Sequence, residues 1–137
     1  MPASPTAGYS GTPLAKKLSL KPGMKAWFVA MPESVRDAIS GSEVLEVTGP
    51  ESGLEAVHIF TKSRFELQNF LNQMRYSIAP NGFVWVSWPK KSSKVPTDII
   101  EDTIREICLP MGFVDVKVCA VDEIWSGLKL MIRKELR

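Results

Sequence analysis

Apolar residues along this chain follow two alternating patterns, continuous runs and stripes with a period of three to four positions. Continuous apolar runs are typical of strands that are covered on both faces, and stripes are typical of amphipathic helices. The runs predict strands at residues 25–30, 56–61 and 83–88, with a shorter one at 44–47. The stripes predict helices at residues 12–18, 33–39, 65–78 and 96–109.

Residues with strong turn and capping preferences mark where these helices begin and end. Ser63 and Glu66 have the spacing of a capping box, in which each side chain satisfies a free backbone amide of the first helical turn. We expect the helix after Ser63 to continue to Ile78 and to end at the turn 80–82. Pro96 is expected to open the last helix, and Gly112 fits the position just after its end.

The C-terminal third predicts a hairpin, because residues 114–120 alternate between apolar and polar and a second strand, 128–134, follows the loop 122–127. Strands that alternate with helices predict parallel pairing, whereas a strand that returns directly is antiparallel. The expected fold class is therefore α/β, with three layers and a mostly parallel sheet that ends in a C-terminal antiparallel hairpin. This order looks like a shortened methyltransferase-type Rossmann topology.

Composition narrows the class of protein. The chain has 137 residues, which suits one domain, and we expect a lead-in at 1–8 followed by a single domain at 9–137. The net charge of +2 is too small to indicate nucleic acid, and no apolar run is long enough to cross a membrane. The two cysteines, Cys108 and Cys119, have no spacing typical of a zinc site. We expect a cytoplasmic protein without a metal.

Several long motifs resemble one known family. They are YSGTPLAKKL from Tyr9, WVSWPKKSS from Trp85 and VDVKVCAVDEIWSGLK from Val114, with the shorter KPGM and VPTD between them. Together they resemble an uncharacterised bacterial family, domain of unknown function family 3052, from Tyr9 to about Arg133. The family has no assigned activity, so the resemblance implies a single domain and adds no catalytic residues.

The turn after the first strand argues against the cofactor that this topology suggests. A nucleotide-type or S-adenosylmethionine (SAM) cofactor needs glycines there, so that the backbone can approach it closely. The chain instead has Met31, Pro32 and Glu33, and no GxG motif. Glu46 is expected to be a solvated carboxylate rather than a ribose ligand. His58 is expected to be a core residue rather than a general base, and we expect no cofactor.

The carboxyl ends of parallel strands meet at one edge of a sheet, which is where α/β proteins bind ligands. The loops expected there carry cations, hydroxyl groups, two carboxylates and two tryptophans, and two helices begin nearby. The candidate ligand-binding residues are Lys62, Ser63, Arg64, Trp88, Lys90, Lys91, Ser92, Lys94, Asp122, Glu123 and Trp125. This edge predicts a non-catalytic binding module for an anionic small molecule or an acidic protein segment.

Other interpretations stay open at this point. Lys90 and Lys91 with Asp122 and Glu123 suit an enzyme of unknown class, or the carboxylates neutralise the lysines by pairing with them. Trp88 and Trp125 either form aromatic surfaces or fill the core. A homodimer through the last strand, at 128–132, is the third possibility. The role of Tyr9 to Pro13 is undecided.

Overall fold

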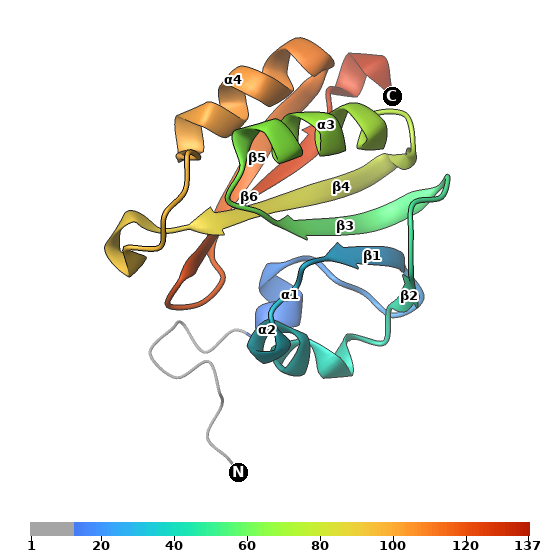
Figure 1. The fold of residues 1–137 in the computed structure, drawn as a ribbon. Coiled ribbons are helices and arrows are strands. Elements are labelled where there is room, and N and C mark those ends of the chain that lie inside the picture. Colours follow the sequence, from blue (N-terminus) through green and yellow to red (C-terminus); the bar gives the residue numbers. More distant parts are fainter. Residues whose placement is uncertain (1–12) are drawn as a thin grey trace.

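The structure, a computed structural model, describes residues 13–137. Six strands form one sheet in the order β2-β1-β3-β4-β6-β5 (Figure 1). Their bounds are β1 Lys25–Val29, β2 Leu45–Val47, β3 Leu54–Phe60, β4 Ile78–Pro89, β5 Phe113–Ala120 and β6 Trp125–Ile132. The first four strands pair in parallel, and β6 is antiparallel to both β4 and β5. The mostly parallel sheet with a C-terminal antiparallel hairpin is confirmed.

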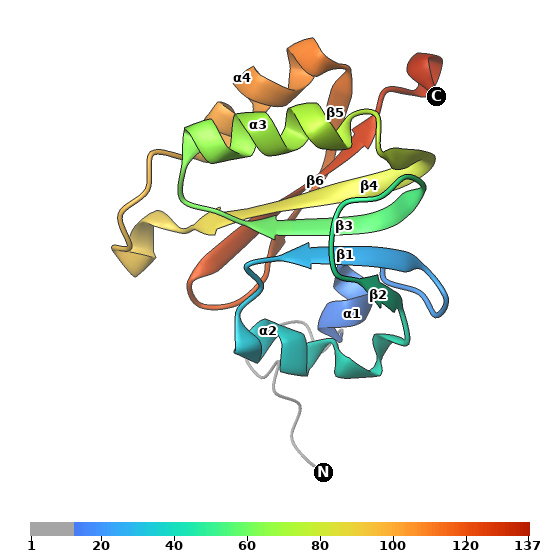
Figure 2. The same ribbon diagram turned by 45° about the vertical axis from the view of Figure 1, so that its right-hand side comes forward.

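Helices cover both faces of the sheet and give three layers (Figure 2). Two short helices, α1 (Leu14–Lys17) and α2 (Glu33–Ala38), cover one face, and α3 (Arg64–Met74) and α4 (Glu101–Met111) cover the other. Single 3₁₀ turns lie at η1 (Ser40–Ser42), η2 (Lys91–Ser93) and η3 (Lys134–Leu136). Residues 1–12, which hold the expected lead-in at 1–8 and most of the Tyr9 to Pro13 segment, lie outside the described residues.

Burial on both faces explains the continuous apolar runs of the central strands. In β3 and β4, side chains that point toward α3 and α4 alternate with side chains that point toward α1 and α2, and both sets are buried. The first set includes Val57, Ile59, Val84 and Val86, and the second includes Ala56, Phe60, Phe83 and Trp85. A strand that is buried on both faces needs apolar residues at successive positions, so its sequence does not alternate between apolar and polar.

The expected end of the helix after Ser63 is wrong. Helix α3 ends at Met74, and Ile78 is the first residue of β4, where it pairs with Leu54 of β3. The residues expected to form a turn, 80–82, lie inside β4, at a register shift against β3. A proline is tolerated in a strand at such an irregularity, because no regular ladder hydrogen bond is lost there.

The expected start of the last helix is also wrong, because α4 begins at Glu101 and not at Pro96. The loop before it folds back on the end of β3, where the Thr97 hydroxyl and the Asp98 amide both donate to the carbonyl oxygen of Lys62, at 2.8 and 3.2 Å. The helix starts only after this contact. The helix ends at Met111, two residues later than expected, and Gly112 follows it in the left-handed conformation with φ 100°, as expected.

The last strand starts earlier than expected and lies inside the sheet. Strand β6 begins at Trp125, which pairs with Pro89, so residues 125–127 belong to the strand and not to the loop. Both edges of β6 are occupied, one by β4 and one by β5. It therefore has no free edge at which a second copy could add a strand. A homodimer through residues 128–132 stays a prediction and would need a contact other than strand pairing. The strand at this edge of the sheet is β5.

Candidate functional site

The structure brings the predicted segments to one edge of the sheet. Residues 62–64 follow β3, residues 90–94 follow β4 and residues 122–124 follow β5, and the carboxyl ends of these strands point the same way. The Lys90 amide donates to the carbonyl oxygen of Ile124 at 2.7 Å, which holds the second and third segments together. The contact of the 94–100 loop with Lys62 joins them to the first.

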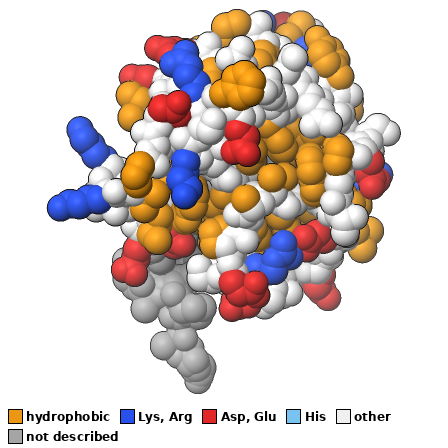
Figure 3. Space-filling model, in the orientation of Figure 1, with side chains coloured by type: hydrophobic (Ala, Val, Ile, Leu, Met, Phe, Trp, Pro, Cys, Tyr) orange, Lys and Arg blue, Asp and Glu red, His pale blue; other side chains and the backbone are white. Residues whose placement is uncertain are grey.

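Four lysines at this edge have no counter-charge from the described residues. Lys62, Lys91 and Lys94 are exposed and Lys90 is half-buried. None of their ammonium groups has an ion-pair partner among residues 13–137. Three of them come from the short segment 90–94, and Figure 3 shows blue side chains that project from this side of the molecule. We call these four residues the lysine edge.

Ser63 and Arg64 are occupied by internal contacts. The Ser63 hydroxyl accepts from the Glu66 amide at 3.1 Å, and Asp98 accepts from the Arg64 amide at 2.7 Å. The Arg64 side chain pairs with Glu106 at 3.4 Å. The first turn of α3 therefore has a carboxylate of the protein where we expected an external anion to bind.

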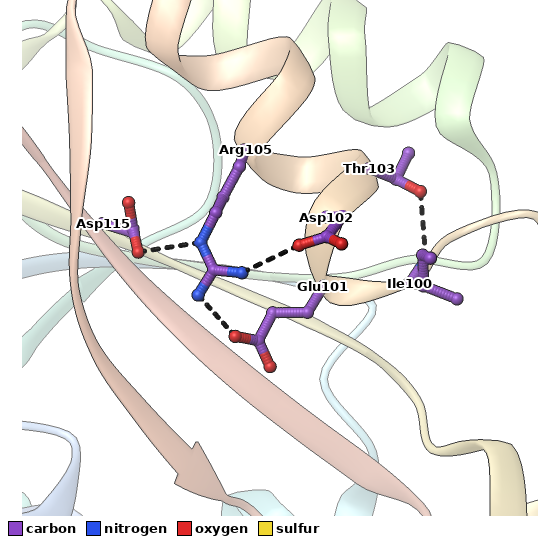
Figure 4. A network of polar contacts seen from close by, with 6 residues as sticks. All are labelled: Ile100, Glu101, Asp102, Thr103, Arg105 and Asp115. Atoms are coloured by element: carbon purple, nitrogen blue, oxygen red, sulfur yellow. Dashed lines mark hydrogen bonds and ion pairs between the residues drawn. The ribbon is translucent and has the colours of Figure 1, made fainter.

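The start of α4 is acidic, and its carboxylates pair with Arg105 of the same helix (Figure 4). The Arg105 guanidinium donates to Asp115 at 3.0 Å and to Asp102 at 3.1 Å, and it also pairs with Glu101. The contacts with Asp115 and then with Glu101 raise the pKa of Arg105 above its ordinary value. The Ile100 amide donates to the Thr103 hydroxyl. The expected second helix terminus thus offers no anion site.

The two carboxylates after β5 do not neutralise the lysine edge. One oxygen of Asp122 accepts from the Ile124 and Trp125 amides, both at 2.8 Å, and so fixes the tight turn of the hairpin. Glu123 is exposed. Within residues 13–137, neither forms an ion pair with Lys90 or Lys91, so the pairing considered from the sequence is absent there.

The two tryptophans have different environments, and neither forms an open aromatic surface. Trp88 is 7% exposed and belongs to the core under α3 and α4. Trp125 is half-buried on the other face of the sheet, where its ring meets the edge of Phe60 at 5.2 Å between centroids. Ser92 is exposed in η2. The polar and charged residues alone remain as the accessible part of the predicted site.

The buried titratable groups belong to the core. His58 is 2% exposed, lies 2.7 Å from the Ser87 hydroxyl through Nε2 and stacks on Phe60. Burial lowers the pKa of His58 to about 3, and it raises the pKa of the Cys108 thiol to about 12. Burial also raises the pKa of Cys119. These groups are neutral at pH 7 and are enclosed by apolar side chains.

Two further classes of site are absent from residues 13–137. No helix in this part of the chain is long and apolar enough to cross a membrane. The same residues contain no group of three or more His, Cys, Asp or Glu side chains placed to hold a metal ion.

Solved structures with the same fold include SAM-dependent methyltransferases and a ribosomal protein L11 methylase. A SAM-dependent methyltransferase from Aquifex aeolicus superposes with a TM-score of 0.62 at 16% identity, over 87% of each chain. A TehB-like SAM-dependent methyltransferase from Corynebacterium glutamicum gives 0.57 at 9% identity, over 93% of this chain and 91% of the other. A ribosomal protein L11 methylase from Lactobacillus delbrueckii gives 0.55 at 10% identity, over 87% and 74%. The fold is that of the methyltransferases.

Neither protein-family models nor curated proteins match the chain. Identities of 16% and below show the fold alone. The resemblance to domain of unknown function family 3052 is therefore not confirmed by a family model.

The turn where this fold holds its cofactor does not fit SAM. Ala30, directly after β1, has a left-handed φ of 57° and carries a Cβ where glycine would leave bare backbone. Pro32 has no amide to donate, and Glu33 puts a carboxylate in the first turn of α2. Glu46 of β2 is exposed to solvent, as expected, and its carboxylate pairs with Arg36 at 2.7 Å.

Proposed function

We propose that this chain is a non-catalytic binding domain with a methyltransferase fold, and that it binds an acidic protein segment through the lysine edge. The observation that carries the proposal is the absence of a counter-charge for Lys62, Lys90, Lys91 and Lys94 among the described residues. An exposed lysine that pairs with nothing contributes little to folding, whereas grouped cations attract an anionic partner over about 8 Å at physiological salt.

The shape of the edge favours a protein segment over a small anionic molecule. Small molecules bind mostly in concave sites that bury most of their surface. The segment 90–94 instead carries three lysines between β4 and the loop before α4, and Lys91 and Lys94 are exposed. An extended acidic segment can contact such side chains one after another. A net charge of only +2 favours this partner over nucleic acid.

The non-catalytic part of the proposal is supported by the turn after β1. Ala30, Pro32 and Glu33 provide a Cβ, a missing amide and a negative charge where the fold otherwise supplies glycine backbone to a cofactor. Without a close approach of the backbone to SAM, the domain has the fold of a methyltransferase but does not bind the methyl donor. Membership of family 3052 and a cytoplasmic location belong to the same proposal, supported by the quoted motifs and by two buried free thiols.

Fluorescence anisotropy with a labelled poly-glutamate peptide tests the partner. The triple variant Lys90→Gln/Lys91→Gln/Lys94→Gln is expected to bind about tenfold more weakly than the unaltered chain, because charge contacts are lost. The control variant Lys16→Gln/Lys21→Gln/Lys134→Gln removes the same charge from exposed lysines elsewhere.

Equal weakening in the two triple variants would show that only net charge matters and would refute the lysine edge. Tighter binding of a short oligonucleotide than of the peptide would refute the choice of partner. A calorimetric titration with SAM is expected to give no binding heat, and a measurable affinity would refute the non-catalytic assignment.

A further inference from the structure

Three large apolar side chains are exposed beside the lysine edge. Phe65 lies in the first turn of α3, three residues after Lys62, and is 75% exposed. Ile100, directly before α4, is 63% exposed, and Ile124, between β5 and β6, is 42% exposed. Figure 3 shows orange side chains next to the blue ones on this side of the molecule. Apolar surface and cations are therefore presented together.

Backbone hydrogen bonds hold these apolar residues close to the lysines. The Ile124 carbonyl oxygen accepts from the Lys90 amide at 2.7 Å, so Ile124 lies against the segment 90–94. Asp98, two residues before Ile100, donates its amide to the carbonyl oxygen of Lys62 at 3.2 Å. The fold itself thus places apolar residues next to cations that are distant in the sequence.

The exposure of Phe65 is not compensated by an internal ring contact. Tyr76 is similarly exposed, but the Arg75 guanidinium lies over its ring, 5.0 Å from the centroid. Among residues 13–137, no ring and no cation stacks on Phe65. Single exposed apolar residues are ordinary, whereas apolar residues grouped within a polar rim are typical of a protein interface. Exposed aromatic side chains are frequent anchors of such interfaces.

Carboxylates within the same region favour a peptide over a flat anionic surface such as a membrane. Glu123 is exposed directly beside Ile124, and Glu66 follows Phe65 in α3. A flat layer of negative charge that reached these apolar residues would also approach both carboxylates and be repelled by them. In an extended peptide, successive side chains point in opposite directions. Such a peptide can direct carboxylates to the lysines and apolar side chains to the apolar residues.

We infer that the acidic segment bound by the lysine edge carries bulky apolar side chains among its carboxylates. Its carboxylates pair with the lysine edge, and its apolar side chains pack on Phe65, Ile100 and Ile124. The apolar contacts add binding free energy that salt does not screen, whereas the charge contacts are screened. This inference rests on the proposed function and adds a second chemical requirement for its partner.

Fluorescence anisotropy with two labelled peptides of equal length and charge tests this inference. The apolar peptide alternates glutamate with leucine and phenylalanine, and the serine peptide has serine at each apolar position. The unaltered chain is expected to bind the apolar peptide about tenfold more tightly. The variant Phe65→Ser/Ile100→Ser/Ile124→Ser is expected to lose this difference and to bind the serine peptide as before, because it keeps every lysine.

A matched control removes three exposed apolar side chains elsewhere. The variant Leu45→Ser/Tyr76→Ser/Leu136→Ser changes residues that are 62%, 83% and 44% exposed, and it is expected to keep the tenfold difference. Circular dichroism and thermal unfolding of both variants verify that the fold is kept. An equal loss of the difference in the control would overturn the inference, because apolar association would then not be specific to this edge.

The two peptides separate failure of this inference from failure of the proposed function. Equal affinity of the unaltered chain for both peptides would overturn the inference and leave the proposed function standing. Binding of neither peptide would overturn the proposed function, and the inference with it. Sedimentation of the chain with vesicles of equal parts phosphatidylserine and phosphatidylcholine, abolished in the Phe65 triple variant, would overturn the choice of a protein segment.

Discussion

His58, the only histidine of the chain, makes the stability of the fold depend on pH in a way that can be calculated. Burial lowers its pKa to about 3, whereas an unfolded chain has a histidine pKa of about 6.5. Below pH 6.5 the unfolded state therefore binds a proton that the folded state excludes. The stability that depends on His58 is complete above pH 6.5 and is lost as the pH falls toward 3.

The size of the effect follows from the difference in pKa. Each pH unit below 6.5 costs about 1.4 kcal/mol, so the free energy of unfolding is expected to fall by about 2 kcal/mol at pH 5. Most carboxylates titrate below this pH. Between pH 7.5 and pH 5, His58 is therefore expected to be the main cause of the loss.

Urea unfolding followed by tryptophan fluorescence at pH 7.5, 6.5 and 5 measures this loss. The double variant His58→Phe/Ser87→Ala replaces both members of the buried pair by apolar groups, and it is expected to lose much less stability over the same range. The imidazole NMR signal of the folded chain gives a second measurement. A midpoint near pH 6.5 in that signal, or an equal loss of stability in the double variant, would refute the reasoning.

Three further predictions rest on single contacts. Gly82→Ala is expected to lose about 1–3 kcal/mol of stability in urea unfolding, because its Cβ would lie 2.7 Å from a backbone oxygen, whereas Gly49→Ala, with open space around it, is expected to cost little. Cys108 is expected to react with a thiol reagent at pH 8 only after denaturation, since burial raises its pKa to about 12; rapid reaction of the native chain would contradict this. Asp122→Ala is expected to lower the melting temperature by removing the acceptor of two amides, and Glu123→Ala is expected to leave it unchanged.

The candidate site was predictable in part. Lys62 and the segment 90–94 could be placed at one edge because the carboxyl ends of parallel strands meet there, a rule that depends only on strand order and direction. The acidic groups that occupy the two helix starts could not be found in this way. Asp98 reaches the Arg64 amide across 34 residues, and no local pattern signals such a contact.

The local sequence determined those strands and helix ends that depend only on neighbouring residues. Burial on both faces requires apolar side chains at successive positions, so β3 and the second half of β4 could be predicted from their apolar runs. Ser63 and Glu66 marked the first turn of α3, because the hydrogen bond between them spans only three residues. Those features follow from neighbouring residues alone.

Tertiary structure decided the rest. Helix α4 begins only at Glu101 because the preceding loop is bound to the carbonyl oxygen of Lys62. Ile78 belongs to β4 because it pairs with Leu54 of β3. Strand β5 lies at the edge of the sheet because β6 lies between β4 and β5. Each of these outcomes depends on hydrogen bonds or packing between segments far apart in the chain, and their free energy is absent from any window of the sequence.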